Sequence, residues 1–137
     1  MNSYISVKKI KSDGQIVNVD GKDCVKVIYP DGYESYCPAD DFKRHYFRLE
    51  KDNKISQSDV DRFAGFFEYH ELDERTVVGM ATAVNKFKVI EASACVKPET
   101  YDLKIGMDIC RDRIKNKFWA FLGFLLACAD YGMECDE

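Results

Sequence analysis

Residues 105–129, IGMDICRDRIKNKFWAFLGFLLACA, have the spacing of a long amphipathic helix. Apolar side chains recur at steps of three and four residues, which places them on one face of a helix. Pro98-Glu99-Thr100 favours a helix start, and we expect the helix to run to about Ala129. The predicted core-facing stripe consists of Met107, Cys110, Ile114, Phe118, Phe121, Leu125 and Cys128.

Two antiparallel β regions are predicted before this helix. Asp20-Gly21 and Asp31-Gly32 are strong hairpin signals, and Asn85-Lys86 predicts a third turn. The strands predicted around these turns are residues 4–11, 16–19, 24–29, 33–37, 75–84 and 87–95. The predicted fold class is therefore α+β: an N-terminal antiparallel β-meander, a second β-hairpin and a long C-terminal helix in a single domain.

Two shorter helices complete the predicted fold. Pro38 suits the first position of one helix, and Ser56 is typical of the N-terminus of another, whose apolar positions extend to Phe67. Between these helices lies the polar loop 51–54. The predicted organisation is a single domain, residues 1–137, with a β-rich N-terminal half, 1–50, and a C-terminal half, 55–130, that holds the hairpin and the long helix.

The composition argues against binding to DNA, RNA or membranes. The formal net charge is -4 and the pI is about 5.3, whereas nonspecific binding to nucleic acid needs a net basic face. The N-terminal residues show no apolar signal-peptide region, and the longest apolar run, 118–129, is too short to span a bilayer. We therefore expect a soluble, cytoplasmic protein.

No residue pattern predicts catalysis, a cofactor or a metal site. The chain has no nucleophile elbow, no H-E-x-x-H motif and no glycine-rich phosphate loop, and its two histidines are isolated. The six cysteines form no C-x-x-C pair, so we interpret them as reduced, small apolar residues. The sequence gives no positive reason to expect an enzyme.

Four cations in the last helix form two pairs. Arg111 and Lys115 lie one turn apart beside the apolar stripe, on the same side as Trp119, whereas Arg113 and Lys117 fall on the other side. Arginine suits bidentate contact with phosphate, and an aromatic neighbour can stack on a base. The alternative is a solvated amphipathic helix whose lysines keep their charges in water, and the spacing alone favours this alternative.

Two segments resemble motifs of short phage proteins. Residues 29–38, YPDGYESYCP, followed by Asp41-Phe42, are similar to a YPDGYESWSP…F motif, although an ordinary hairpin with aromatic cross-strand pairs has the same pattern. Residues 91–102, EASACVKPETYD, followed by Ile105-Gly106, are similar to an ESACVxPENYDxxIG motif. With both motifs in this order, the chain resembles the first-described family of phage anti-defence sponges against the Thoeris immune system.

The resemblance implies a homo-oligomer that binds and sequesters a TIR-derived cyclic ADP-ribose isomer without degrading it. Some relatives also hold cyclic oligonucleotide immune signals. On this basis we expect Arg111 and Lys115 to bind the diphosphate of a cyclic nucleotide, and Tyr36 and Phe87 to stack on the adenine. Ser93, within the second motif, is a further candidate for ligand binding.

The sequence departs from the family pattern at four positions. Tyr36 and Cys37 replace a tryptophan and a serine of the first motif, and Thr100 replaces an asparagine of the second. Lys115 stands where an arginine is expected, so the fork geometry is lost while the positive charge stays.

Self-association follows from the residues as well as from the resemblance. The run 118–126 is apolar on nearly every side of the predicted helix, which is more than one small core usually covers. We therefore expect at least a dimer.

Two alternatives to a sponge are a protein–protein module that inhibits a host defence factor and an enzyme that degrades the signal.

Overall fold

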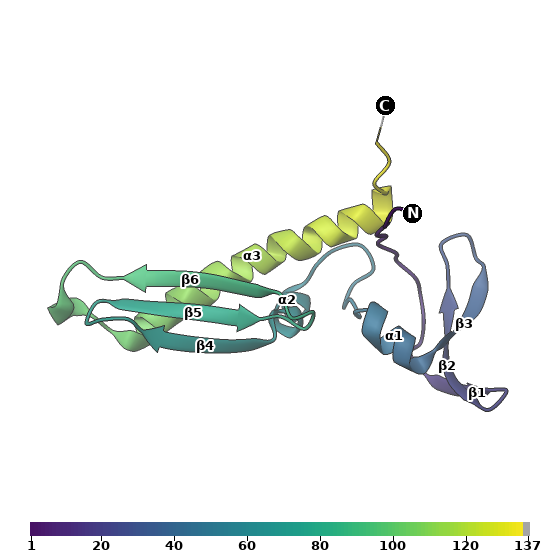
Figure 1. Cartoon of the computed structure of the whole chain (residues 1–137), viewed down its shortest axis with the longest axis horizontal. Coiled ribbons are helices and arrows are strands. Elements are labelled where there is room, and N and C mark those ends of the chain that lie inside the picture. Colours follow the sequence, from purple (N-terminus) through teal and green to yellow (C-terminus); the bar gives the residue numbers. More distant parts are fainter. Residues whose placement is uncertain (136–137) are drawn as a thin grey trace. The chain divides into compact units, whose positions relative to one another are not determined.

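The computed structural model describes residues 1–135 and confirms the α+β fold class. Its internal contacts divide the chain into two units, Leu49–Phe124 on the one hand and Met1–Arg48 with Leu125–Glu137 on the other. Each unit contains one three-stranded antiparallel sheet (Figure 1). The long helix α3, Leu103–Tyr131, contributes residues to both units. The predicted domain limits stay a prediction.

The sheet of the first unit is the predicted meander. Its strands, in the order β1-β2-β3, are β1 (Ile16–Val19), β2 (Lys22–Ile28) and β3 (Glu34–Pro38). The first turn places Asp20 at φ 52° and Gly21 at φ 84°, which is the left-handed backbone that a tight hairpin requires. Helix α1 (Ala39–His45) follows β3 directly, with Pro38 as its N-cap residue.

The predicted strand over residues 4–11 is wrong. Lys11 forms a single bridge with Ile28, and the residues before it belong to no strand. The register explains this result, because β1 pairs with residues 22–25 of β2 and leaves only the far end of β2 open on that edge. A single bridge to Lys11 therefore satisfies the backbone N–H and C=O groups of Ile28, with which β1 does not pair.

The second unit has one more strand than the sequence predicts. Helix α2 (Gln57–Ala64) ends at Gly65, whose φ of 74° favours glycine, and the chain then enters β4 (Phe66–Glu71). Phe67, predicted to extend α2, therefore lies in a strand. The remaining elements are β5 (Thr76–Thr82), β6 (Lys88–Ala94), the short 3-10 helix η1 (Pro98–Thr100) and α3.

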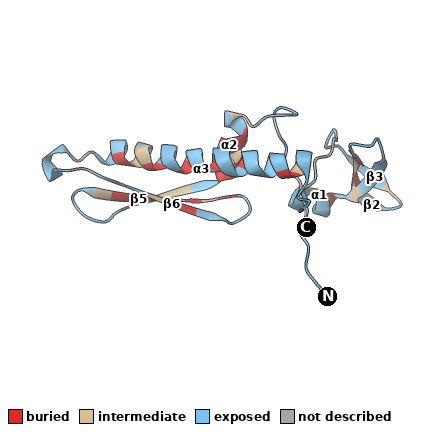
Figure 2. Ribbon diagram, turned by 90° about the horizontal axis from the view of Figure 1, so that it is seen from above, coloured by how far each residue is buried: buried red, intermediate tan, exposed pale blue. Residues whose placement is uncertain are grey.

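Helix α3 lies along one face of the sheet β4-β5-β6 (Figures 1 and 2). Its fully buried side chains in this unit, Cys110, Ile114, Phe118 and Leu122, follow one another at steps of four. The predicted stripe is therefore only partly right, because Phe121 and Leu125 keep 40% and 38% of their surfaces exposed. A step of four drifts slowly around the helix, so Leu122 rather than Phe121 is buried.

Two glycines allow this helix to approach the sheet closely. A Cβ atom at Gly106 of α3 would lie 2.6 Å from Val77 Cγ1, and one at Gly79 of β5 would lie 2.8 Å from Cys110 Cβ. Neither distance is tolerated in a packed interior. The absence of a Cβ atom at both glycines therefore allows the short distance between the helix and the sheet.

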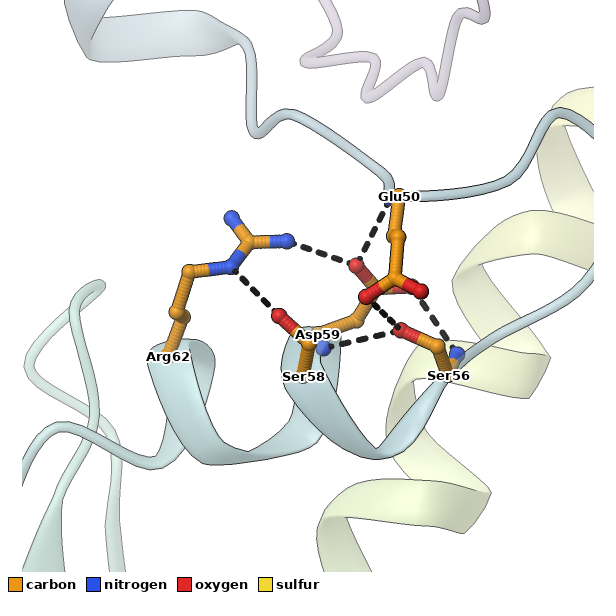
Figure 3. A network of polar contacts seen from close by, with 5 residues as sticks. All are labelled: Glu50, Ser56, Ser58, Asp59 and Arg62. Carbon is orange, nitrogen blue, oxygen red and sulfur yellow. Dashed lines mark hydrogen bonds and ion pairs between the residues drawn. The ribbon is translucent and has the colours of Figure 1, made fainter.

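A buried carboxylate fixes the start of α2 (Figure 3). Asp59 accepts hydrogen bonds from the backbone N–H groups of Ser56 and Glu50, both at 2.9 Å, and from Arg62 Nη2 at 2.6 Å. In return the Ser56 hydroxyl accepts from the Asp59 N–H, which completes a capping box. This network ties the loop before α2 to the helix.

Candidate functional site

Arg111 is held between α3 and the edge strand β4. Its Nε atom donates a hydrogen bond of 3.1 Å to Tyr69 Oη, and its Cζ atom lies 5.3 Å from the centroid of the Phe67 ring. Phe67 and Tyr69 are stacked on each other, with centroids 6.4 Å apart. The hydrogen bond from Arg111 to Tyr69 raises the pKa of the guanidinium above its ordinary value. This cation is therefore positioned rather than loosely solvated.

Lys115 lies one turn further along α3 and is paired with α2. Its Nζ atom contacts Asp61 Oδ1 at 2.9 Å, and Gln57 Nε2 donates to the same carboxylate oxygen at 2.9 Å. These hydrogen bonds from Lys115 and Gln57 lower the pKa of Asp61. The ion pair fixes where the ammonium stands, and it also neutralises part of its charge.

The second pair of cations turns to the opposite edge of the sheet. Arg113 Nη1 donates to the Ala92 carbonyl at 2.7 Å, and Lys117 Nζ contacts Glu91 Oε1 at 2.8 Å, both on β6. The structure thus separates the two pairs as the helical spacing predicts. Arg111 contacts β4 and Lys115 contacts α2, whereas Arg113 and Lys117 both contact β6.

The structure does not bring all five predicted ligand residues together. Arg111 and Lys115 are neighbours on α3, but Phe87 packs edge-on against Phe121, about 15 Å further along the helix axis. Ser93 of β6 pairs with Val77 of β5, so two strand spacings, about 10 Å, separate Ser93 from β4.

Tyr36, the fifth predicted ligand residue, belongs to the first unit, and 52% of its surface is exposed. Its ring is available to a partner molecule.

The aromatic residues next to Arg111 were missed by the sequence analysis. Phe67 and Tyr69 alternate in the segment FFEYHE of β4, and both point to the face that α3 covers. The signal was present, because an aromatic run that directly follows a glycine is typical of a strand. Helical spacing up to Phe67 concealed it.

Two hollows flank the cations, both within the second unit. One, of about 550 Å³, runs along β4 and is lined on the helix side by Leu103 and Met107. The other, of about 500 Å³, lies between α2 and α3 beside Lys115 and Trp119. Arg111 stands on α3 between the residues that line the two hollows.

The fold therefore defines an α+β protein in which a long C-terminal helix presents positioned cations along a small antiparallel sheet. The chain belongs to the family of phage proteins described as Phage protein (N4 Gp49/phage Sf6 gene 66), whose model matches residues 43–129. The match includes Arg111, Lys115 and the whole sheet β4-β5-β6. No curated protein and no solved structure matches the chain. Among residues 1–135, no helix is long and apolar enough to cross a membrane.

Proposed function

We propose that this phage protein is an anti-defence sponge, which binds a TIR-derived cyclic ADP-ribose isomer in the host cytoplasm and holds it without degrading it. The observation that carries the proposal is the position of Arg111. The hydrogen bond to Tyr69 and the contact with the Phe67 ring fix the guanidinium, and we expect its outer nitrogens to bind the ligand.

The outer nitrogens of Arg111 are available for a phosphate. Within residues 1–135, the Nη atoms of Arg111 make no hydrogen bond or ion pair. A guanidinium donates two parallel hydrogen bonds to a phosphate, and fixing the side chain in advance reduces the entropy that binding would cost. A diphosphate therefore matches Arg111 as the principal contact.

Lys115 supports the same ligand in a secondary role. An ammonium group has three donors, and the contact with Asp61 occupies one of them. The remaining donors lie about 6 Å along the helix axis from Arg111, which is one helical turn. Lys115 is therefore expected to contribute less than Arg111, because Asp61 competes for its charge.

Self-association belongs to the proposal. Phe124 keeps 69% of its surface exposed, and Phe121 and Phe87, which contact each other, are also exposed in the same unit. Aromatic side chains left in water at this density favour a second copy of the chain as their partner. The same face supports the second candidate function, a module that inhibits a host defence factor by binding it.

Isothermal titration with the cyclic ADP-ribose isomers tests the proposal. A sponge binds one isomer and releases the intact molecule when the complex is heated, which chromatography of the supernatant detects. Recovery of a cleaved product would mean that the chain is an enzyme. Absence of binding to every isomer would overturn the sponge and favour the inhibitory module. Cyclic dinucleotides and trinucleotides, titrated in the same way, test the second ligand class.

A further inference from the structure

The hollow between α2 and α3 has a chemistry of its own. Gln57 and Asp61 line it from α2, and Asp112, Lys115, Asn116 and Trp119 line it from α3. Its volume of about 500 Å³ falls within the range of small-molecule sites. All six residues belong to the same unit, so the hollow is complete within one chain.

The charges next to Asp112 disfavour a phosphate at that carboxylate. Two carboxylates, Asp61 and Asp112, face one ammonium, Lys115, and that ammonium is already paired with Asp61 at 2.9 Å. The remaining charge at Asp112 is negative and attracts hydrogen-bond donors. An uncharged group that carries hydrogen-bond donors therefore fits beside Asp112.

Three side chains in the hollow are free to make new contacts. Among the described residues, the side chains of Asp112, Asn116 and Trp119 take part in no hydrogen bond. Trp119 keeps 37% of its surface exposed, which leaves the indole accessible to a planar ligand. An indole stacks on any base, while a carboxylate and an amide select among bases through their edge groups.

We propose that this hollow is a subsite for an amino-substituted purine, which stacks on Trp119 while Asp112 and Asn116 hydrogen-bond to its amino edge. Arg111, Lys115 and Trp119 follow one another at one-turn intervals of about 6 Å, so the phosphate contacts and the stacking residue fall on consecutive turns of α3. The inference rests on the proposed function, because it assigns the base of the captured nucleotide to a place beside the phosphate-binding cations.

The fluorescence of Trp119 measures this subsite directly, because Trp119 is the chain's single tryptophan. Three probes are titrated into the full chain: AMP, IMP, which has a carbonyl in place of the amino group, and inorganic pyrophosphate. We expect AMP to quench the fluorescence, with an affinity about fivefold or more above that of IMP, and pyrophosphate to leave it unchanged. Equal quenching by AMP and IMP, or none by either, overturns the subsite.

A pair of variants on one helix face controls for loss of charge. Asp112→Ala removes the acceptor in the hollow, whereas Asp108→Ala removes a carboxylate one turn earlier that pairs with Lys104 outside it. The first is expected to weaken AMP binding about tenfold and the second to leave it unchanged. Equal affinities for both variants overturn the assignment of Asp112.

The outcomes separate this subsite from the sponge function. If AMP quenches Trp119 but calorimetry detects no binding of any cyclic ADP-ribose isomer, the subsite stands and the sponge falls. If an isomer binds with no change in fluorescence, and Trp119→Ala binds it as tightly as the parent, the subsite falls and the sponge stands.

Discussion

Tyr69 of β4 accepts a hydrogen bond of 3.1 Å from Arg111 of α3, so strand and helix together hold one guanidinium. Tyr69→Phe removes the acceptor and keeps the ring that stacks on Phe67. We expect binding of the cyclic ADP-ribose isomer to weaken about three- to tenfold, because the guanidinium is less well fixed. Calorimetry measures the change, with Tyr33→Phe, at an exposed position between β2 and β3, as the control. Equal affinities for the two variants would contradict this role of Tyr69.

The acid stability of the fold is expected to depend on Asp59. Burial raises the pKa of its carboxyl, but hydrogen bonds from Ser56 and Glu50 and the charge of Arg62 outweigh this and hold the pKa below its ordinary value of 3.8. A lowered pKa in the folded state stabilises the fold above the unfolded pKa, and that contribution is lost as the pH falls through the folded pKa. The free energy of unfolding should therefore decrease below about pH 4.

Asp59→Asn tests this dependence. The amide places a donor where Ser56 and Glu50 already donate, so we expect the free energy of unfolding to fall by about 2 kcal/mol at pH 7. The decrease in the free energy of unfolding between pH 5 and 3 should also be smaller for this variant than for the parent, by about the contribution of the Asp59 carboxylate. Urea denaturation at several pH values measures both. Asp108→Asn, at an exposed ion pair, is the control, and identical pH profiles for parent and Asp59→Asn would refute the prediction.

Two glycines of α3 should respond to alanine in opposite directions. At Gly106 a Cβ atom meets Val77 Cγ1 at 2.6 Å, so Gly106→Ala is expected to lower the free energy of unfolding by about 1–3 kcal/mol. At Gly123 nothing lies within 4 Å, so Gly123→Ala should raise it by about 0.5–1 kcal/mol through helix propensity. Thermal denaturation measures the stability of both variants. If both changes in stability have the same sign, α3 does not pack on β5 as described.

The oligomeric state is tested through Phe124, which keeps 69% of its surface exposed. We expect light scattering at micromolar concentration to give at least a dimer for the parent and a smaller species for Phe124→Glu, because a buried charge disfavours the interface. Phe66→Glu is the matched control, since Phe66 is similarly exposed at 65% but lies on β4. A monomeric parent would contradict the proposed self-association.

The sequence predicts those parts of the fold that local chemistry determines. Asp20-Gly21 marks the first hairpin, Ser56 caps α2, and the long apolar period defines α3. Strand β4 was missed because Phe67 continues the helical spacing of α2, whereas Gly65 ends the helix two residues earlier. The positive φ of Gly65 ends the helix there, although the hydrophobic spacing continues to Phe67.

The candidate site could be predicted only in part, for a different reason. Helical spacing alone places Arg111 and Lys115 on one side of α3 and Arg113 on the other, as the structure shows. The partners of these cations, Tyr69 and Asp61, come from elements distant in the sequence, and local periodicity carries no information about them. Those partners hold the Arg111 guanidinium through its Nε atom and partly neutralise Lys115.

Titration of a cyclic ADP-ribose isomer into the parent, Arg111→Ala and Arg113→Ala tests the phosphate-binding role of Arg111 most directly. Both variants lose one positive charge from α3, but the guanidinium of Arg113 is committed to the Ala92 carbonyl on β6, at 2.7 Å. We predict that the parent binds, that Arg111→Ala binds about ten- to a hundredfold more weakly, and that Arg113→Ala binds like the parent. If the folded Arg111→Ala variant binds as tightly as the parent, or if the parent binds no isomer, the proposal is contradicted.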